Sequence, residues 1–297
     1  MKRMKGFALL WFLILTAIVI AACGSSSQQP DDYTPEYAAD NNIAAEEELQ
    51  EYQPTTEEIY PSESEDTYEE YSPEQEANNI NAIEAVDIES REYYILPPPI
   101  TEGGISVEEA LTNRRSHRNF RNEPLTIYQV SQLLWAAYGI TLPIPDAHHL
   151  RGGLRTTPSA GATYPLELYV VIGNVTGINP GVLRYISEEH KLVRVVDGDV
   201  RRELTAAALG QQMVEAAPIS IFYSAYFPRI TERYGERGIR YAYIELGHSA
   251  QNVYLQAEAL GLGTVAIGAF FDYMVREILN LPYEEEPLYI MPIGYFY

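Results

Sequence analysis

The sequence of 297 residues contains a single cysteine, Cys23. A disulfide needs two cysteines, so none can form within the chain, and any folded part must be stabilised by an apolar core. The adjacent His148 and His149 have no cysteine or carboxylate at the spacing of a zinc site. We therefore expect neither a disulfide nor a metal site.

Basic residues are also scarce, with 20 Lys and Arg against 42 Asp and Glu and a formal charge of −22. Residues 1–23 carry three bases and no acid, and residues 24–92 carry 21 acids and one base. Residues 93–297 carry 21 acids and 16 bases, a net charge of −5. No basic stripe is visible, so we expect no nucleic-acid partner.

Long hydrophobic runs are limited to residues 6–20, which is shorter than the roughly 20 residues of a membrane-spanning helix. This run follows a basic start and ends in Ile-Ala-Ala-Cys at residues 20–23. The pattern resembles the processing site of a bacterial lipoprotein. The resemblance implies that residues 1–22 are a signal peptide, that Cys23 carries a lipid, and that the protein is extracytoplasmic and anchored to the membrane. The alternative is an uncleaved membrane anchor with an incidental cysteine.

Residues 23–92 repeat Tyr, Pro and Glu without a fixed period and contain few large aliphatic residues. Such a segment cannot bury enough apolar surface to offset its loss of entropy, so we expect a disordered, extended linker. A dedicated ligand for a basic partner is the alternative. Residues 93–297 have ordinary globular composition and are expected to form one domain.

Helical and strand patterns alternate in this domain without a regular βαβ rhythm, so we expect an α+β fold with a mostly antiparallel sheet packed by helices. Residues 140–157 are expected to form a polar loop. The expected helices start at Ser106 and Thr126 and cover 200–209, 239–260 and 273–279. The expected strands cover 166–172, 182–186, 191–196, 219–224, 265–269 and 288–295.

Three patches of residues are candidates for binding a ligand. The first patch consists of Arg114, Arg115, Ser116 and Arg118, whose guanidinium groups suit a phosphate monoester, although such clusters also occur as solvated surface. The second patch, residues 157–167, places small residues between prolines, where a flat ligand can approach the backbone closely. The third patch, residues 261–270, is glycine-rich and can expose backbone N–H groups. Taken singly, each glycine segment is also typical of a turn.

In this order and with these separations, the three patches resemble the nitroreductase family of flavoproteins. They are most similar to its branch of thiazoline and oxazoline dehydrogenases from peptide-tailoring systems. Residues 247–252 and 292–295 add to the resemblance, which covers about 190 residues. It implies an FMN-dependent oxidoreductase that forms an intertwined homodimer with two shared active sites.

The resemblance also implies roles for particular residues. Arg114, Arg115, Ser116 and Arg118 match positions that hold the FMN phosphate and ribityl chain. Pro158, Ser159, Ala160 and Gly161 match a loop that lies along the isoalloxazine and comes from the other subunit. Gly268 and Ala269 match backbone donors near the reactive flavin nitrogen.

The sequence departs from the family pattern at two places. Many nitroreductases add basic residues beyond the final Gly-Tyr, whereas this sequence ends at Tyr297, which leaves the phosphate to the first patch. Ala162 replaces a polar side chain that typical nitroreductases place beside the flavin. The second departure bears against nitro reduction more than against flavin binding.

Tyrosines and arginines cluster in residues 223–243, and a phenol beside a guanidinium can transfer protons. We expect Tyr234 to be the catalytic acid or base, with packing as the alternative role of these tyrosines. His248, in the middle of the long predicted helix, is expected in the core or at the dimer interface.

Nicotinamide cofactors are essentially absent outside the cell, so a flavin there must be reduced by its substrate or by a membrane redox partner. We therefore expect a dehydrogenase or oxidase of a small-molecule or peptide substrate. One alternative is an NAD(P)H-dependent nitro or quinone reductase. Another is a non-catalytic lipoprotein that binds a flavin or another ligand.

Overall fold

The computed structural model describes residues 91–121, 123–144 and 150–297. The predicted signal peptide, Cys23 and nearly all of the predicted linker lie outside these residues. In the described part of the chain, no helix combines the length and the apolar character needed to cross a membrane.

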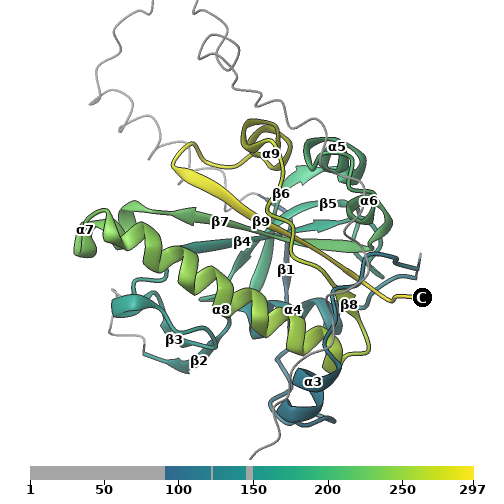
Figure 1. The fold of residues 1–297 in the computed structure, drawn as a ribbon, viewed down its shortest axis with the longest axis horizontal. Helices are drawn as coiled ribbons and strands as arrows, with labels where there is room; N and C mark the ends of the chain where they lie inside the picture. Colours follow the sequence, from purple (N-terminus) through teal and green to yellow (C-terminus); the bar gives the residue numbers. More distant parts are fainter. Residues whose placement is uncertain (1–90, 122, 145–149) are drawn as a thin grey trace, which may run out of the picture. The chain divides into compact units, whose positions relative to one another are not determined.

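A seven-stranded sheet forms the centre of the fold, and every neighbouring pair of its strands is antiparallel (Figure 1). This confirms the predicted α+β class. In spatial order the strands are β1 (Tyr93–Ile95), β6 (Lys191–Asp197), β5 (Gly181–Ile186), β4 (Leu166–Ile172), β7 (Ile219–Tyr226), β9 (Glu285–Gly294) and β8 (Gly263–Thr264).

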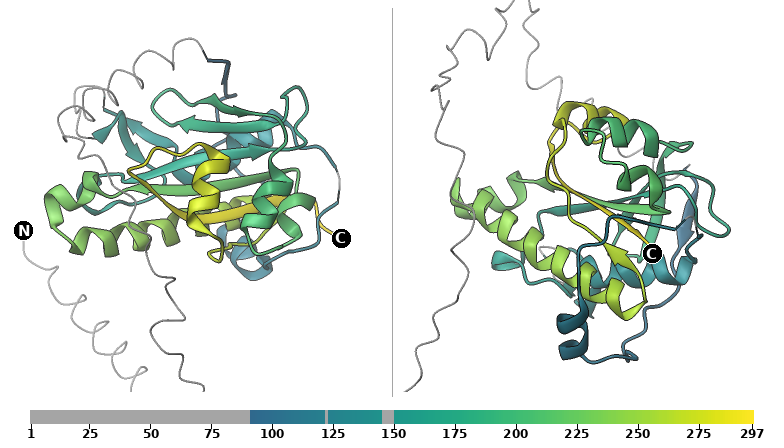
Figure 2. Two further views of the ribbon diagram at one scale, coloured as in Figure 1. Left: turned by 90° about the horizontal axis from the view of Figure 1, so that it is seen from above. Right: turned by 45° about the vertical axis from the view of Figure 1, so that its right-hand side comes forward.

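Helices cover both faces of this sheet, as Figure 2 shows. One face packs against α4 (Ile127–Tyr138) and α8 (Arg237–Ala259), and the other packs against α5 (Arg201–Ala207), α6 (Met213–Ala216) and α9 (Asp272–Leu279). Strand β4 is buried on both sides, with Leu168 and Val170 in the first core and Tyr169 and Val171 in the second. The apolar composition of this strand, apart from Glu167, follows from that double burial.

The predicted helices are present. Helix α3 (Val107–Asn113) starts after Ser106, whose side chain accepts a hydrogen bond from the Glu109 N–H at 3.1 Å. Helix α4 has a complete capping box, because Thr126 and Gln129 each bond the other's backbone. These contacts satisfy N–H groups that the first turn of a helix leaves free. Helix α7 (Pro228–Tyr234) precedes α8.

The prediction of a loop over residues 140–157 was wrong in part. Strands β2 (Ile140–Pro143) and β3 (Gly153–Arg155) pair as a separate antiparallel ribbon. Pro143 ends a strand of this two-stranded ribbon, where no third strand needs its missing N–H. Residues 145–149 lie outside the described residues.

The predicted strand at 265–269 was also wrong. Regular pairing is confined to β8, and beyond it only Ile267 returns to the sheet, exchanging two hydrogen bonds of 2.9 Å with Ile290. The chain then leaves the edge, so that Gly268 and Ala269 are exposed. An apolar run next to an edge does not by itself produce a ladder.

Candidate functional site

The first patch follows the end of α3 and lies against the start of the third patch. Ser116 forms a parallel bridge with Thr264, and the His117 N–H donates to the Thr264 carbonyl at 3.0 Å. Ser116 and the guanidinium-bearing Arg115 and Arg118 are exposed, and Arg114 is half-buried. Within residues 91–121, 123–144 and 150–297, none of the three arginines has a carboxylate partner. Their charges are therefore available to an anion.

Tyr254 of α8 joins the first patch to the third. Its hydroxyl lies 3.2 Å from Ser116 Oγ and accepts a hydrogen bond from the Ala266 N–H at 2.9 Å. The Arg114 guanidinium lies 5.3 Å from the centre of the Tyr254 ring. Sequence reasoning missed Tyr254, although it lies only two positions after the motif at residues 247–252 of the long helix.

The third patch offers two backbone donors. Gly268 and Ala269 are exposed, and in the described part of the chain their N–H groups make no hydrogen bond. They lie just beyond Ala266, which Tyr254 links to the first patch. Tyr254 thus links Arg114 and Ser116 of the first patch to the segment that carries the two unpaired backbone N–H groups. Guanidinium groups without carboxylate partners, hydroxyls and backbone N–H groups are the donors that suit a flavin mononucleotide.

The second patch is a tight turn. Gly161, Ala162 and Tyr164 have positive φ angles of 60°, 53° and 49°. The left-handed conformation costs a non-glycine residue roughly 1–2 kcal/mol, so the surrounding contacts must hold the turn in place. One such contact is internal, because Ser159 Oγ accepts a hydrogen bond from the Tyr164 N–H at 2.9 Å.

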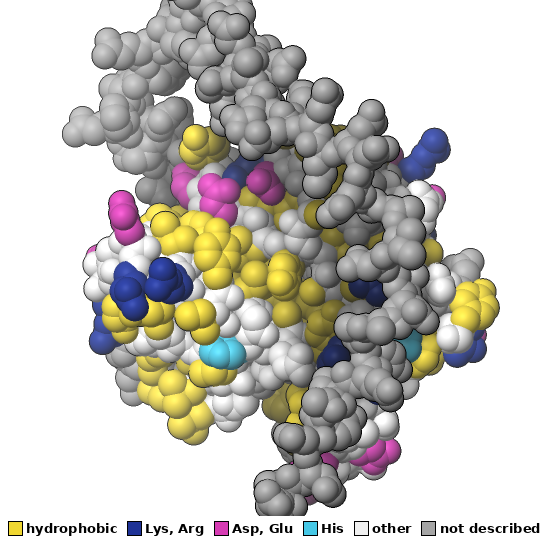
Figure 3. All heavy atoms as spheres, in the orientation of Figure 1, with side chains coloured by type: hydrophobic (Ala, Val, Ile, Leu, Met, Phe, Trp, Pro, Cys, Tyr) yellow, Lys and Arg dark blue, Asp and Glu magenta, His cyan; other side chains and the backbone are white. Residues whose placement is uncertain are grey.

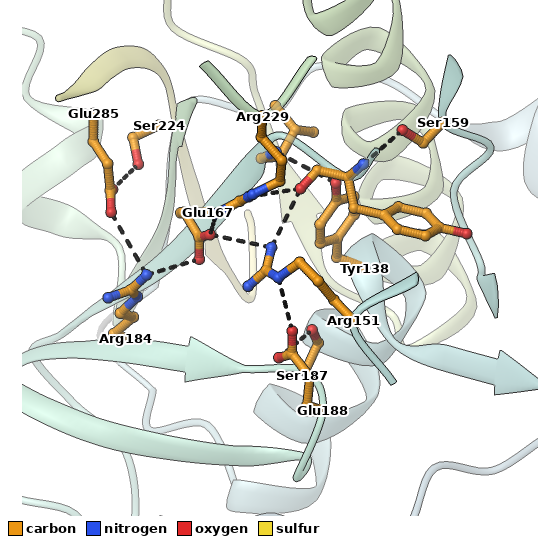
Figure 4. Close-up of polar contacts among 12 residues, drawn as sticks. Tyr138, Arg151, Ser159, Glu167, Arg184, Ser187, Glu188, Ser224, Arg229 and Glu285 are labelled. Atoms are coloured by element: carbon orange, nitrogen blue, oxygen red, sulfur yellow. Dashed lines mark hydrogen bonds and ion pairs between the residues drawn. The ribbon is translucent and has the colours of Figure 1, made fainter. Parts of the chain in front are cut away.

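A cluster of arginines and carboxylates fixes the far end of this turn (Figure 4). The Tyr164 carbonyl accepts hydrogen bonds from Arg229 at 2.7 Å and Arg151 at 3.2 Å. Both arginines also pair with the buried Glu167, and Arg184 is its third partner. Burial alone would raise the pKa of Glu167, but the three guanidinium groups outweigh it and lower that pKa to about 2.

Glu245 of α8 lies beneath the turn, with 1% of its surface exposed. The Tyr138 hydroxyl donates to Glu245 Oε1 at 2.5 Å and accepts from the Leu166 N–H at 3.3 Å. Burial raises the pKa of Glu245 to about 7, against the opposing effects of Ser159, Tyr138 and nearby arginines. Sequence reasoning did not single out this carboxylate, because a glutamate in a helix usually faces solvent.

Tyr234, the predicted acid or base, lies beside the turn. A methyl group placed on Gly161 would be 2.5 Å from the Tyr234 hydroxyl and 2.9 Å from Arg233 Nη1. Arg233 Nη1 also donates to the Gly161 carbonyl at 3.2 Å, and the Tyr234 ring packs edge-on against Tyr241. The structure therefore brings Tyr234 to the second patch, while its catalytic role stays a prediction.

The two halves of the predicted flavin site lie over different parts of α8. The first and third patches meet at Tyr254, and the second patch lies over Glu245. These positions are nine residues apart, or roughly 13 Å along a helix. Among the described residues, no hydrogen bond or ion pair joins Pro158–Gly161 to the first patch.

Two further points of the sequence analysis concern His248 and metal binding. His248 is exposed on α8, so it is not a core histidine. No grouping of three or more His, Cys, Asp or Glu suited to a metal ion occurs in the part of the chain that the structure describes.

Comparisons with known proteins identify the family of the chain. Residues 111–295 match the nitroreductase family. A Methanocaldococcus jannaschii protein, assigned by name to the nitroreductases, is 48% identical over 66% of this chain and 93% of its own length. A trifolitoxin-processing protein of Rhizobium leguminosarum is 29% identical over 45% of this chain and 36% of its own length.

A solved structure from Anabaena variabilis, also named as a nitroreductase, superposes with a TM-score of 0.60 and 28% identity. The match covers 70% of this chain and 42% of that protein, so the chain spans less than half of the length of this structural relative. With the family match extending over more than half of the sequence, the chain belongs to the nitroreductase family.

Proposed function

We propose that this protein is an FMN-dependent oxidoreductase that acts as a dehydrogenase or oxidase outside the membrane. The observation that carries the proposal is the meeting at Tyr254 of Arg114 and Ser116, from the arginine patch, with Ala266, which lies just before the two free backbone N–H groups of the third patch. Membership of a family with flavin-dependent members supports the same cofactor.

In this proposal, Arg114, Arg115 and Arg118 hold the phosphate, and Ser116 and Tyr254 hold the ribityl chain. FMN, when bound, supplies hydride chemistry. Backbone donors at Gly268 and Ala269 would stabilise the negative charge that develops on the ring during that chemistry. Phosphate held by charge-assisted contacts gives orientation as well as affinity.

The active unit in this proposal is a homodimer in which Pro158–Gly161 of one subunit completes the site of the other. The exposed face of α8 supports it, because Tyr243 and Ile244 are 51% and 50% exposed and the neighbouring Gly247 and His248 are exposed as well. Figure 3 shows hydrophobic side chains gathered on the side where α7 and α8 lie in front. An apolar helix face of this kind is typical of an interface.

The proposed location rests on the sequence alone. The basic start, the short apolar run and the small residues before Cys23 favour a lipid-anchored protein outside the membrane. The acidic residues that follow would then serve as a spacer between the anchor and the domain.

A second candidate is the ordinary NAD(P)H-dependent nitro or quinone reductase, which the 48% identity to a protein named as a nitroreductase favours. The similarity to a trifolitoxin-processing protein favours a peptide substrate instead. A non-catalytic, flavin-binding lipoprotein is the third candidate, and Ala162 in place of a polar side chain beside the flavin is compatible with it.

Stopped-flow mixing of the FMN-loaded full chain with NADPH, without oxygen, separates these candidates. The dehydrogenase proposal predicts slow or absent bleaching of the flavin, because the compartment offers no nicotinamide. Rapid bleaching at micromolar NADPH would establish the reductase in its place. A flavin that resists NADPH, candidate peptide substrates and quinols alike would favour the non-catalytic protein.

A further inference from the structure

Glu245 is a buried carboxylate that the flavin-binding role does not use directly. Oε1 accepts a hydrogen bond from the Tyr138 hydroxyl at 2.5 Å, whereas Oε2 has no hydrogen-bond partner in the described part of the chain. Leaving a charged oxygen unpaired in the interior is costly. The carboxyl is therefore sensitive to small changes in the groups around it.

The groups that face Glu245 come from four elements. Tyr138 comes from α4, Arg155 from β3 and Arg229 from α7, while Ser159 and Tyr164 come from the turn. A salt bridge to Glu245 is absent among the described residues, because Arg229 pairs with Glu167 and Arg155 pairs with Glu188. The arginines stabilise the ionised carboxylate only from a distance.

The same groups hold the turn. The Arg155 guanidinium packs against two rings, 4.5 Å from the centre of Tyr138 and 4.7 Å from that of Tyr164. Ser159, which favours the ionised form of Glu245, also accepts the Tyr164 N–H. A change in the hydrogen bonding of the Glu245 carboxyl should therefore affect both Ser159 and Tyr164, the two ends of the turn.

We propose that Glu245 is a positioning residue for the Ser159–Tyr164 turn, and that its protonation state sets how the turn meets the isoalloxazine. A neutral carboxyl can donate a hydrogen bond toward Ser159, while an ionised one can only accept. The hydroxyl hydrogen of Ser159 must point differently in the two states, although its oxygen keeps the Tyr164 N–H. The proposal rests on FMN binding at this turn, and the buried acid would make that binding depend on pH near neutrality.

The test is FMN affinity of the full chain from about pH 5.5 to about pH 8.5, for the wild type, Glu245→Gln and the control Glu232→Gln on the exposed side of α7. We expect the wild-type and control Kd to change about tenfold around neutral pH, and the Glu245→Gln Kd to stay constant. A Glu245→Gln profile that follows the wild type would overturn the proposal.

A second variant covers the case in which Glu245→Gln does not fold. Tyr138→Phe keeps the ring but removes a hydrogen bond that favours the ionised carboxyl, so the midpoint of the profile should move to higher pH. An unchanged midpoint in this variant would also contradict the positioning role.

Hydrogen exchange without flavin separates this proposal from the proposed function. For peptides that cover the turn, the exchange rate of Tyr138→Phe is divided by the exchange rate of the wild type at the same pH. We expect this ratio to change across the neutral range. A ratio that is constant with pH would overturn the positioning role even if FMN binds. Absence of FMN binding at every pH would overturn the proposed function, and the exchange ratio would still decide the role of Glu245 in the turn.

Discussion

The arginines of the first patch are the residues on which cofactor affinity should depend most. In the proposed site, replacing Arg114 and Arg118 with alanine would remove two charge-assisted contacts to the phosphate, each worth roughly 1.5–3 kcal/mol. The Kd for FMN should therefore rise by at least about a hundredfold. Fluorescence titration measures it, with Arg202→Ala, exposed on α5, as the matched control. An affinity equal to that of the control would exclude the patch from the site.

Glu245 should affect the pH dependence of the free energy of unfolding as well as that of FMN binding. Its pKa is raised to about 7 from 4.5, so between these values the folded state binds a proton that the unfolded state has lost. The free energy of unfolding should thus fall as pH rises through this window and level off above it. Compared with Glu245→Gln, which does not titrate, the wild type should lose about 3 kcal/mol in total. Urea unfolding curves measured at several pH values test this, and parallel curves for the two proteins would contradict it.

Residues differ in how much of their role could be read from the sequence. The arginine patch could be singled out because charge and spacing are local properties, and its role in binding a phosphate stays a prediction. Tyr254 and Glu245 could not be singled out, because Ser116 lies 138 positions from Tyr254 and Tyr138 lies 107 positions from Glu245. Only the tertiary fold brings these groups together.

Among the elements, the turn of the second patch is the one whose backbone is most constrained. Gly161→Ala would add a methyl group within 2.5 Å of the Tyr234 hydroxyl at a position with φ of 60°. We expect a loss of stability of about 1–2 kcal/mol and weaker FMN binding, because Tyr234 and Arg233 must move. Urea unfolding and FMN titration check both effects, with Gly104→Ala as the control, since a methyl group there meets no atom within 4 Å. Wild-type affinity in Gly161→Ala would show that the turn does not contact the flavin.

Long elements were predicted well and short ones poorly. The 23-residue α8 and the buried β4 carry strong periodic or continuous apolar signals. Strands β1, β2 and β3 have three or four residues each and are too short for such a signal. The 265–269 segment has a strand-like composition, yet its pairing with β9 is limited by the geometry of the sheet edge.

At the scale of the whole molecule, the exposed apolar face of α8 leads us to predict a homodimer. Ile244→Glu should convert the proposed dimer to a monomer and weaken FMN binding, because a charge buried at an interface without a partner is unfavourable. Light scattering after size exclusion measures the mass. Tyr128→Glu, on an exposed position of α4, is the control and should remain dimeric. A wild-type protein that is monomeric with bound FMN would contradict a shared site.

The proposed attachment to the membrane is a second prediction that concerns the whole chain. Cys23→Ser should release the protein from the membrane or leave it unprocessed, because the serine cannot carry the thioether-linked lipid. Mass spectrometry of the wild type should find a modified Cys23 at the N-terminus. An unmodified Cys23 still joined to residues 1–22 would contradict lipidation.

The measurement that tests the central claim most directly is titration of the purified full chain with FMN, followed by absorption and flavin fluorescence. The account predicts saturation at one FMN per subunit, with the spectral shift of a flavin bound in a protein environment. It also predicts that Arg114→Ala with Arg118→Ala loses that saturation in the same concentration range. A folded wild-type chain that takes up no FMN, or that binds it equally well without the two arginines, would contradict the account.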